Sequence, residues 1–159
     1  QGASRFSGEA TTVSSFPLVV GTQFNIPFLL NQRGSGHQIK GELYEVNMKK
    51  LEILDELEAH PILYERKLEK VVIDETGTTV DAWVYIIHKW DANFESTCSK
   101  PMDSYSTTGS HGRPYLDRYV RAKLMKEEET NLFKEIMGYD PREDGCTIGV
   151  GKAPEGIDQ

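Results

Sequence analysis

Two strand-like segments separated by a short turn restrict the fold of this chain more than any other feature. Residues 64–73 alternate in polarity, and residues 80–88 carry apolar side chains on both faces. Alternation with a period of two is typical of a half-buried strand, whereas apolar residues on both faces are typical of a central strand. The turn-forming residues Asp74-Glu75-Thr76-Gly77 lie between the two segments. We therefore predict a hairpin, with its second strand central in a sheet or barrel.

Three further strand-like runs precede this hairpin, after a small and polar segment at residues 1–15. Residues 16–20 form a short apolar run, and residues 26–30 form a second one that contains a proline. A proline restricts that second run to a sheet edge or a strand start. Residues 38–46 mix β-forming residues with a glycine. A chain rich in strands with few helices is thus expected.

The clearest predicted helix in the first two-thirds of the chain spans residues 48–59. Asn47 is a suitable N-cap, and His60-Pro61 marks the end of the helix. A helical wheel with about 100° per residue places Glu58 within the apolar arc that contains Leu51 and Leu54. The neighbouring acidic residues lie at the margin of that arc or beyond it. Glu58 is therefore the one carboxylate predicted to face the interior.

Such a position would give Glu58 a distinctive chemistry. Burial in apolar surroundings raises the pKa of a carboxyl group, so that it can both accept and donate a proton near neutral pH. That property is typical of a general acid/base. In the alternative interpretation, Glu58 lies in the last helical turn and extends to water or caps a neighbouring strand.

Composition excludes several other classes of protein. The chain has 159 residues, a net charge of −7 at pH 7 and no run of Lys and Arg, which argues against a nucleic-acid groove. It has no apolar run of the length that crosses a bilayer and no export signal at its start, so we expect no membrane partner and a cytoplasmic location. The distant Cys98 and Cys146 are expected to be reduced thiols, and neither they nor the four histidines have metal-site spacing.

The last quarter of the chain predicts a helical extension. Apolar residues recur in a broken stripe over residues 119–137, and Gly138 follows as a C-terminal stop. The remaining residues are rich in Gly, Asp and Pro, which favours a flexible tail. We therefore divide the chain into residues 1–118 and a C-terminal helical extension with a tail at residues 119–159.

Several spaced motifs together resemble the gamma-glutamylcyclotransferase superfamily, most closely its gamma-glutamylamine cyclotransferase (AIG2-like) branch. They are Phe16-Pro17-Leu18-Val19, Asn25 to Leu30, Gly41 to Val46, Leu54 to Pro61 with Tyr64-Glu65-Arg66, and Asp103-Ser104-Tyr105 with Gly109 and His111-Gly112. The resemblance covers about residues 6–118. It implies an α+β fold, a small mixed β-barrel with flanking helices, with the active cavity in the barrel.

The resemblance also implies a reaction and its residues. A gamma-glutamyl amine would release 5-oxoproline and a free amine such as lysine, because the α-amine of the substrate attacks its own γ-amide carbonyl. This chemistry needs a proton shuttle but no metal, cofactor or protein nucleophile. The catalytic glutamate of the family falls on Glu58, Tyr64 takes the aromatic position beside the site, and Tyr105 is a candidate for the cavity rim. Both tyrosines could equally be packing residues.

One family motif is missing from the given sequence. The family begins with a Tyr-Gly-Thr/Ser-Leu loop that holds the gamma-glutamyl group, and this sequence starts beyond it. We expect an incomplete or processed sequence, a variant transcript, or a catalytically inactive relative. The second candidate function is accordingly a binding module that meets a partner through the helix at residues 119–137.

Overall fold

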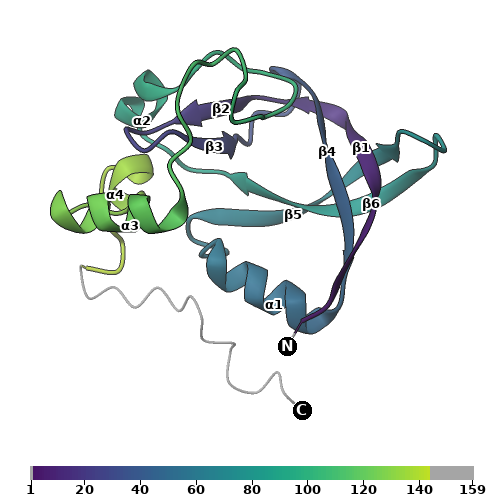
Figure 1. The fold of residues 1–159 in the computed structure, drawn as a ribbon, viewed down its shortest axis with the longest axis horizontal. Helices are drawn as coiled ribbons and strands as arrows, with labels where there is room; N and C mark the ends of the chain where they lie inside the picture. Colours follow the sequence, from purple (N-terminus) through teal and green to yellow (C-terminus); the bar gives the residue numbers. More distant parts are fainter. Residues whose placement is uncertain (1, 144–159) are drawn as a thin grey trace.

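A computed structural model describes residues 2–143 of the chain as an antiparallel sheet, a separate strand pair and four helices (Figure 1). The strands are β1 (Ser4–Phe16), β2 (Leu18–Gly21), β3 (Ile26–Leu29), β4 (His37–Val46), β5 (Tyr64–Ile73) and β6 (Thr79–Ile87). The helices are α1 (Met48–Leu57), α2 (Ala92–Thr97), α3 (Arg118–Glu127) and α4 (Leu132–Met137). The main sheet has the order β4-β1-β5-β6, and β2 pairs with β3.

β1 is the longest strand, and the sequence pattern predicts no strand over most of it. It pairs with β4 over most of its length and with β5 at residues 10–12. Its pairing with β4 shifts register between Phe6 and Gly8 and again between Thr11 and Ser15. Such bulges bend a strand and increase its twist, which fits the curled sheet in Figure 1. The small polar side chains of β1 hide its strand character because they give no apolar alternation.

The predicted hairpin is confirmed, but its details differ from the prediction. β5 and β6 pair from Tyr64 opposite Ile87 to Val72 opposite Thr79. In the part of the chain that the structure describes, β6 ends the sheet order, so its predicted central position is wrong. Trp83 on β6 is 49% exposed. The guanidinium of Arg66 lies 4.2 Å from the centre of the Trp83 ring, so a neighbouring side chain covers this outward apolar residue.

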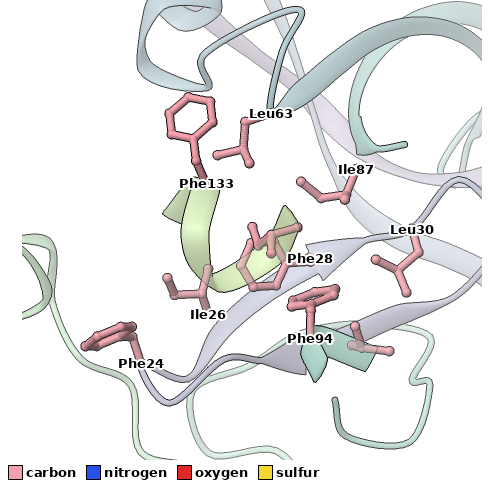
Figure 2. Packing of buried hydrophobic residues seen from close by; sticks show 10 residues of the cluster. Phe24, Ile26, Phe28, Leu30, Leu63, Ile87, Phe94 and Phe133 are labelled. Carbon is pink, nitrogen blue, oxygen red and sulfur yellow. The ribbon is translucent and has the colours of Figure 1, made fainter. Parts of the chain in front are cut away.

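The largest hydrophobic cluster joins elements that lie far apart in the sequence (Figure 2). Phe28 of β3 packs edge-on against Phe94 of α2, with 5.3 Å between the ring centroids. Leu63 and Ile87 belong to the same cluster, as does Phe133 of α4. α4 therefore packs into the core formed by the first 100 residues.

The predicted helix over residues 119–137 is wrong as one continuous helix. The structure has α3 and α4 instead, separated by a turn in which Glu129 has a positive φ of 53°. The Asn131 side chain accepts a hydrogen bond from the Lys134 N–H and caps a new helix. Gly138 ends α4 in the left-handed conformation, as predicted. Residues 144–159 of the predicted flexible tail lie outside the described residues, and the domain division at residue 118 stays a prediction.

Candidate active site

α1 places Glu58 at the point where the helix ends and the chain turns back. The helix begins at its predicted cap, because the Asn47 side chain accepts a hydrogen bond of 2.8 Å from the Lys50 N–H. Leu51 is buried, but Met48 and Leu57 are 72% and 53% exposed. The apolar arc of the wheel is thus only partly buried. Glu58 is the C-cap of the helix and is half-buried.

Backbone hydrogen bonds define the turn after Glu58. The Glu58 N–H donates to the Leu54 carbonyl at 3.0 Å, and the His60 N–H donates to the Asp55 carbonyl at 2.9 Å. Ala59 between them has a positive φ of 49°. The Tyr64 N–H then donates to the Glu58 carbonyl at 3.3 Å, which brings the start of β5 beside the end of α1. Glu58 and Tyr64 are therefore neighbours in space as well as in sequence.

A cavity of about 360 Å³ opens at this turn. Its lining is a mixture of apolar side chains, two tyrosines, one carboxylate and two arginines. The residues are Ile26, Pro27, Leu57, Glu58, Leu63, Tyr64, Tyr115, Arg118, Arg121, Ala122, Met125 and Leu132. They come from β3, the end of α1 and the connection that follows it, the start of β5, the segment before α3, α3 itself and the start of α4. Concave, largely apolar sites with a few converging polar groups are the usual form of small-molecule sites.

The environment raises the pKa of the Glu58 carboxyl above its ordinary value of 4.5. Partial burial is the main cause, because it disfavours the charged form. The positive charges of Arg118 and Arg121 oppose this shift without cancelling it. A carboxyl group with this shift is well suited to both accept and release a proton.

Tyr64 lines the same cavity and is held by an aromatic neighbour. Its ring stacks on Phe28 with 6.2 Å between centroids and 23° between planes. Burial raises the pKa of the Tyr64 hydroxyl, and the nearby Glu58 charge raises it further. The hydroxyl therefore remains protonated at neutral pH and is available as a hydrogen-bond donor.

A second carboxylate, Asp55, fixes the end of α1 against the sheet. Its two oxygens accept hydrogen bonds from Arg66 Nε at 2.9 Å and Arg66 Nη2 at 3.2 Å, and Oδ1 also accepts from the Tyr85 hydroxyl at 2.6 Å. The Arg66 N–H donates to His60 Nδ1 at 3.0 Å. Burial alone would raise the pKa of Asp55, but the hydrogen bonds from Arg66 and Tyr85 outweigh it and lower that pKa. Asp55 is thus an ionised anchor rather than a proton shuttle.

The sequence pattern did not indicate three polar lining residues from the C-terminal part of the chain. Arg118 and Arg121 lie one helical turn apart on α3, and Tyr115 precedes that helix. The spacing of the two arginines places them on one helix face. That face could have been noticed in the sequence. Nothing local indicates that it meets the end of α1.

Tyr105 does not line the cavity that contains Glu58. It lines another cavity, of about 540 Å³, with Glu9, Lys40 and Asp74 among its neighbours. Its ring stacks on His111 with 5.5 Å between centroids. Burial is the main cause of the raised pKa of its hydroxyl, Tyr115 raises that pKa further, and the positive charge of Arg121 opposes the shift. Tyr105 therefore belongs to this neighbouring cavity and not to the one that contains Glu58.

The described residues lack the features of two other classes of site. Residues 2–143 contain no cluster of three or more His, Cys, Asp or Glu side chains placed to hold a metal ion. No helix within the same residues is long and apolar enough to span a membrane.

Comparisons with known proteins agree with this architecture. The family model described as gamma-glutamyl cyclotransferase, AIG2-like, matches residues 1–107. Gamma-glutamylaminecyclotransferase C of Danio rerio is 41% identical, over 76% of this chain and 80% of its own. The gamma-glutamylaminecyclotransferase of Bos taurus is 34% identical, over 76% of this chain and 70% of its own. The crystal structure of an AIG2-like protein from Mus musculus superposes with a TM-score of 0.67 at 36% identity, covering 74% of this chain and 80% of that one.

The chain belongs to the AIG2-like gamma-glutamyl cyclotransferase family. The prediction of an α+β fold, a small mixed β-barrel with flanking helices, is confirmed, and the structure has a curled, barrel-like sheet with flanking helices. Membership of this family supports assignment of the chain as a cyclotransferase.

Proposed function

We propose that this protein is a gamma-glutamylamine cyclotransferase that uses Glu58 as its general acid/base. The observation that carries this proposal is the half-buried Glu58 carboxyl in the wall of the cavity, with its raised pKa. The relatives named gamma-glutamylaminecyclotransferase support the reaction type. We further propose that the products are 5-oxoproline and a free amine.

The reaction needs one group that moves a proton twice. The α-amine of the substrate attacks its own γ-carbonyl carbon, and ionised Glu58 accepts the proton that the new C–N bond displaces. Protonated Glu58 then donates that proton to the departing amine nitrogen as the original amide C–N bond breaks. Every atom of the substrate is recovered in the two products, so no water, metal or cofactor is consumed.

The cavity can also contribute through position and shape. A γ-glutamyl chain that is held folded brings its amine and its carbonyl together, which removes much of the entropic cost of ring closure. The Tyr64 hydroxyl is a neutral donor on the same wall and can hold a polar group of the substrate. Apolar residues such as Ile26, Met125 and Leu132 suit the methylene chain of a lysine leaving group. We therefore propose gamma-glutamyl-epsilon-lysine as the substrate.

The proposal is tested by measuring release of 5-oxoproline from gamma-glutamyl-epsilon-lysine. Glu58→Gln should lower kcat by about 10²–10⁴-fold, the usual contribution of a general acid/base. Glu56→Gln is the matched control, because Glu56 lies on the same helix and is exposed. Loss of activity in both variants, or in neither, would contradict the role of Glu58.

The second candidate, a binding module without activity, is not favoured by the family relationship. That function depended on one helix at residues 119–137, and the structure has two helices, α3 and α4, in its place. Phe133 and Ile136 of α4 are buried in the core and are unavailable to a partner.

A further inference from the structure

α3 presents two arginines to the cavity that the proposed proton transfer does not use. Arg118 and Arg121 both line it, together with Leu57 and Glu58 from the end of α1. In the described part of the chain, neither arginine has an acidic side chain within 4.0 Å, and this includes Glu58, so their charges are not neutralised by an ion pair. The cavity therefore has a cationic wall in addition to its carboxylate.

Arg121 also carries an unsatisfied donor. Its Nε is buried and has no hydrogen-bond partner among the described residues. Its guanidinium carbon lies 5.9 Å from the centre of the Tyr115 ring, a contact that provides no hydrogen-bond acceptor for Nε. Buried polar groups in folded proteins almost always have a partner. Arg121 lines the cavity and has no such partner for its Nε, so its guanidinium is a candidate to bind a molecule in the cavity.

The chemistry of that acceptor follows from the arginine side chain. A guanidinium presents its N–H groups as a planar fork that matches the two oxygens of a carboxylate. A gamma-glutamyl amine carries a carboxylate on its glutamyl part, and gamma-glutamyl-epsilon-lysine carries another on its lysine part. Glu58 forms no ion pair with either arginine in the described part of the chain, so the arginines are free to bind the substrate.

We infer that Arg121, together with Arg118, binds a carboxylate of the substrate. This inference rests on the proposed function for the identity of the ligand. If the arginines contact the carboxylate of the glutamyl part, they hold that part in the cavity. If they contact the carboxylate of the lysine part, they select amines that bear a carboxylate.

Direct binding tests the inference without turnover. Two ligand pairs each differ by one carboxylate: 5-oxoproline and 2-pyrrolidinone represent the glutamyl part, whereas Nε-acetyl-lysine and N-acetylcadaverine represent the lysine part. Binding is measured by NMR titration of the isotope-labelled chain. In at least one pair, the carboxylate ligand should bind about tenfold or more tightly than its partner, as expected of a charge-assisted hydrogen bond. The pair that shows this difference identifies which carboxylate is bound.

Variants show whether the arginines cause the preference. Arg121→Gln, and the double variant with Arg118→Gln, should remove the difference within that pair, and Arg121→Lys should restore only part of it. Lys123→Gln is the matched control, because Lys123 is an exposed cation of α3 outside the cavity lining. The inference is overturned if neither pair shows a preference, or if the preference survives in the double variant with an unchanged amide spectrum.

Failure of the inference and failure of the proposed function give different results. An inactive wild-type chain that prefers the carboxylate ligands, and loses the preference with Arg121→Gln, would retain the binding site and reject the reaction. An active chain in which both arginines are dispensable for binding and for KM would retain the reaction and reject the binding site.

Discussion

The chemistry of single residues in this protein depends on opposing local effects rather than on residue type. Glu58 and Asp55 lie three residues apart, yet their pKa values shift in opposite directions. Hydrogen bonds from Arg66 and Tyr85 outweigh the burial of Asp55, whereas Glu58 has only more distant positive charges. One carboxylate becomes an anchor and the other a candidate proton shuttle, in the manner of acid/base sites whose groups have separated pKa values.

The raised pKa of Glu58 predicts an acidic limb in the pH dependence of activity. The ionised carboxylate is the form that accepts the proton, so kcat/KM should fall as pH decreases through the raised pKa of Glu58, which lies above 4.5. A pH–rate profile with gamma-glutamyl-epsilon-lysine measures this limb. Activity that stays constant down to pH 4 would contradict the assignment of Glu58 as the base.

The raised pKa of Glu58 also predicts how the stability of the fold depends on pH. Activity should rise with pH, whereas the contribution of Glu58 to stability should fall. A carboxyl with a higher pKa in the folded state than in the unfolded state binds more protons when folded, so its contribution to stability decreases as pH rises through that pKa. Above that pKa, ionised Glu58 therefore destabilises the fold, and Glu58→Gln should raise Tm at pH 7 relative to Glu56→Gln. The difference should disappear below pH 4. A lower Tm for Glu58→Gln at pH 7 would contradict the burial effect.

A variant of Tyr64 can separate the contribution of its ring to packing from the contribution of its hydroxyl to catalysis. Tyr64→Phe keeps the ring that stacks on Phe28 but removes the hydroxyl. We expect kcat/KM to fall about tenfold through loss of one hydrogen bond, while the free energy of unfolding changes by less than about 1 kcal/mol. Kinetics and urea unfolding measure the two quantities. An unchanged kcat/KM would make Tyr64 a packing residue only.

At the scale of elements, the site is formed where the end of α1 meets β5, β6 and α3. Asp55, Arg66 and Tyr85 connect α1, β5 and β6 through hydrogen bonds. α3 contributes its two arginines to the lining of the cavity. Figure 1 shows α1 running back from the end of β4 to the start of β5, with α3 near that connection. Glu58 is therefore positioned by contacts between elements and not by α1 alone.

Breaking the Asp55 connection should disturb both stability and catalysis. Asp55→Asn weakens the hydrogen bonds to a guanidinium and a hydroxyl, so we expect a loss of about 1–3 kcal/mol in the free energy of unfolding. We also expect a lower kcat with a smaller change in KM, because Glu58 loses its fixed orientation while the α3 wall stays in place. Urea unfolding and steady-state kinetics measure these effects.

Asp81→Asn is the control for this variant. Asp81 pairs with Lys70 at 2.9 Å, but both side chains are more than half exposed. Such surface pairs contribute about 0–1 kcal/mol. A similar effect of the two substitutions on kcat would show that Asp55 does not position Glu58.

At the scale of the whole molecule, the C-terminal helices and the sheet share one core. Phe133 of α4 is 6% exposed and belongs to the cluster that contains Phe28, Leu63 and Ile87 (Figure 2). Arg142 lies over the Phe133 ring, with 4.1 Å from its guanidinium carbon to the ring centroid. α3 carries the two arginines of the cavity wall. α4 follows α3 in the chain and packs into the core, so it holds the C-terminal end of α3 near the sheet.

Removing the Phe133 side chain should therefore destabilise the entire fold. Phe133→Ala should cost about 3–5 kcal/mol, the usual range for a buried phenylalanine. Tyr119→Ala is the control, because Tyr119 on α3 is 89% exposed and should change stability by about 0.5 kcal/mol or less. A single unfolding transition shifted only by Phe133→Ala is the expected result. A separate transition for the C-terminal part would contradict a shared core.

The sequence by itself determined the features that depend on neighbouring residues. The cap at Asn47, the turn between β5 and β6, and the presence of Glu58 at a helix end all follow from short-range rules of capping, alternation and turns. α1 itself ends at Leu57, two residues before the predicted end at Ala59. The family motifs pointed to the same carboxylate. Each of these signals lies within a few residues of the structure that it specifies.

Only the tertiary structure decided the features that depend on distant contacts. β1 is a strand because β4 and β5 pair with it, although its small polar side chains give no pattern. Buried Glu69 has its ion-pair partner in Arg33, which lies far away in the sequence. The arginines of α3 become part of a cavity because α3 meets the end of α1. The physical reason is the same in each case: burial and charge pairing are properties of the surroundings, and folding brings those surroundings together from separate parts of the chain.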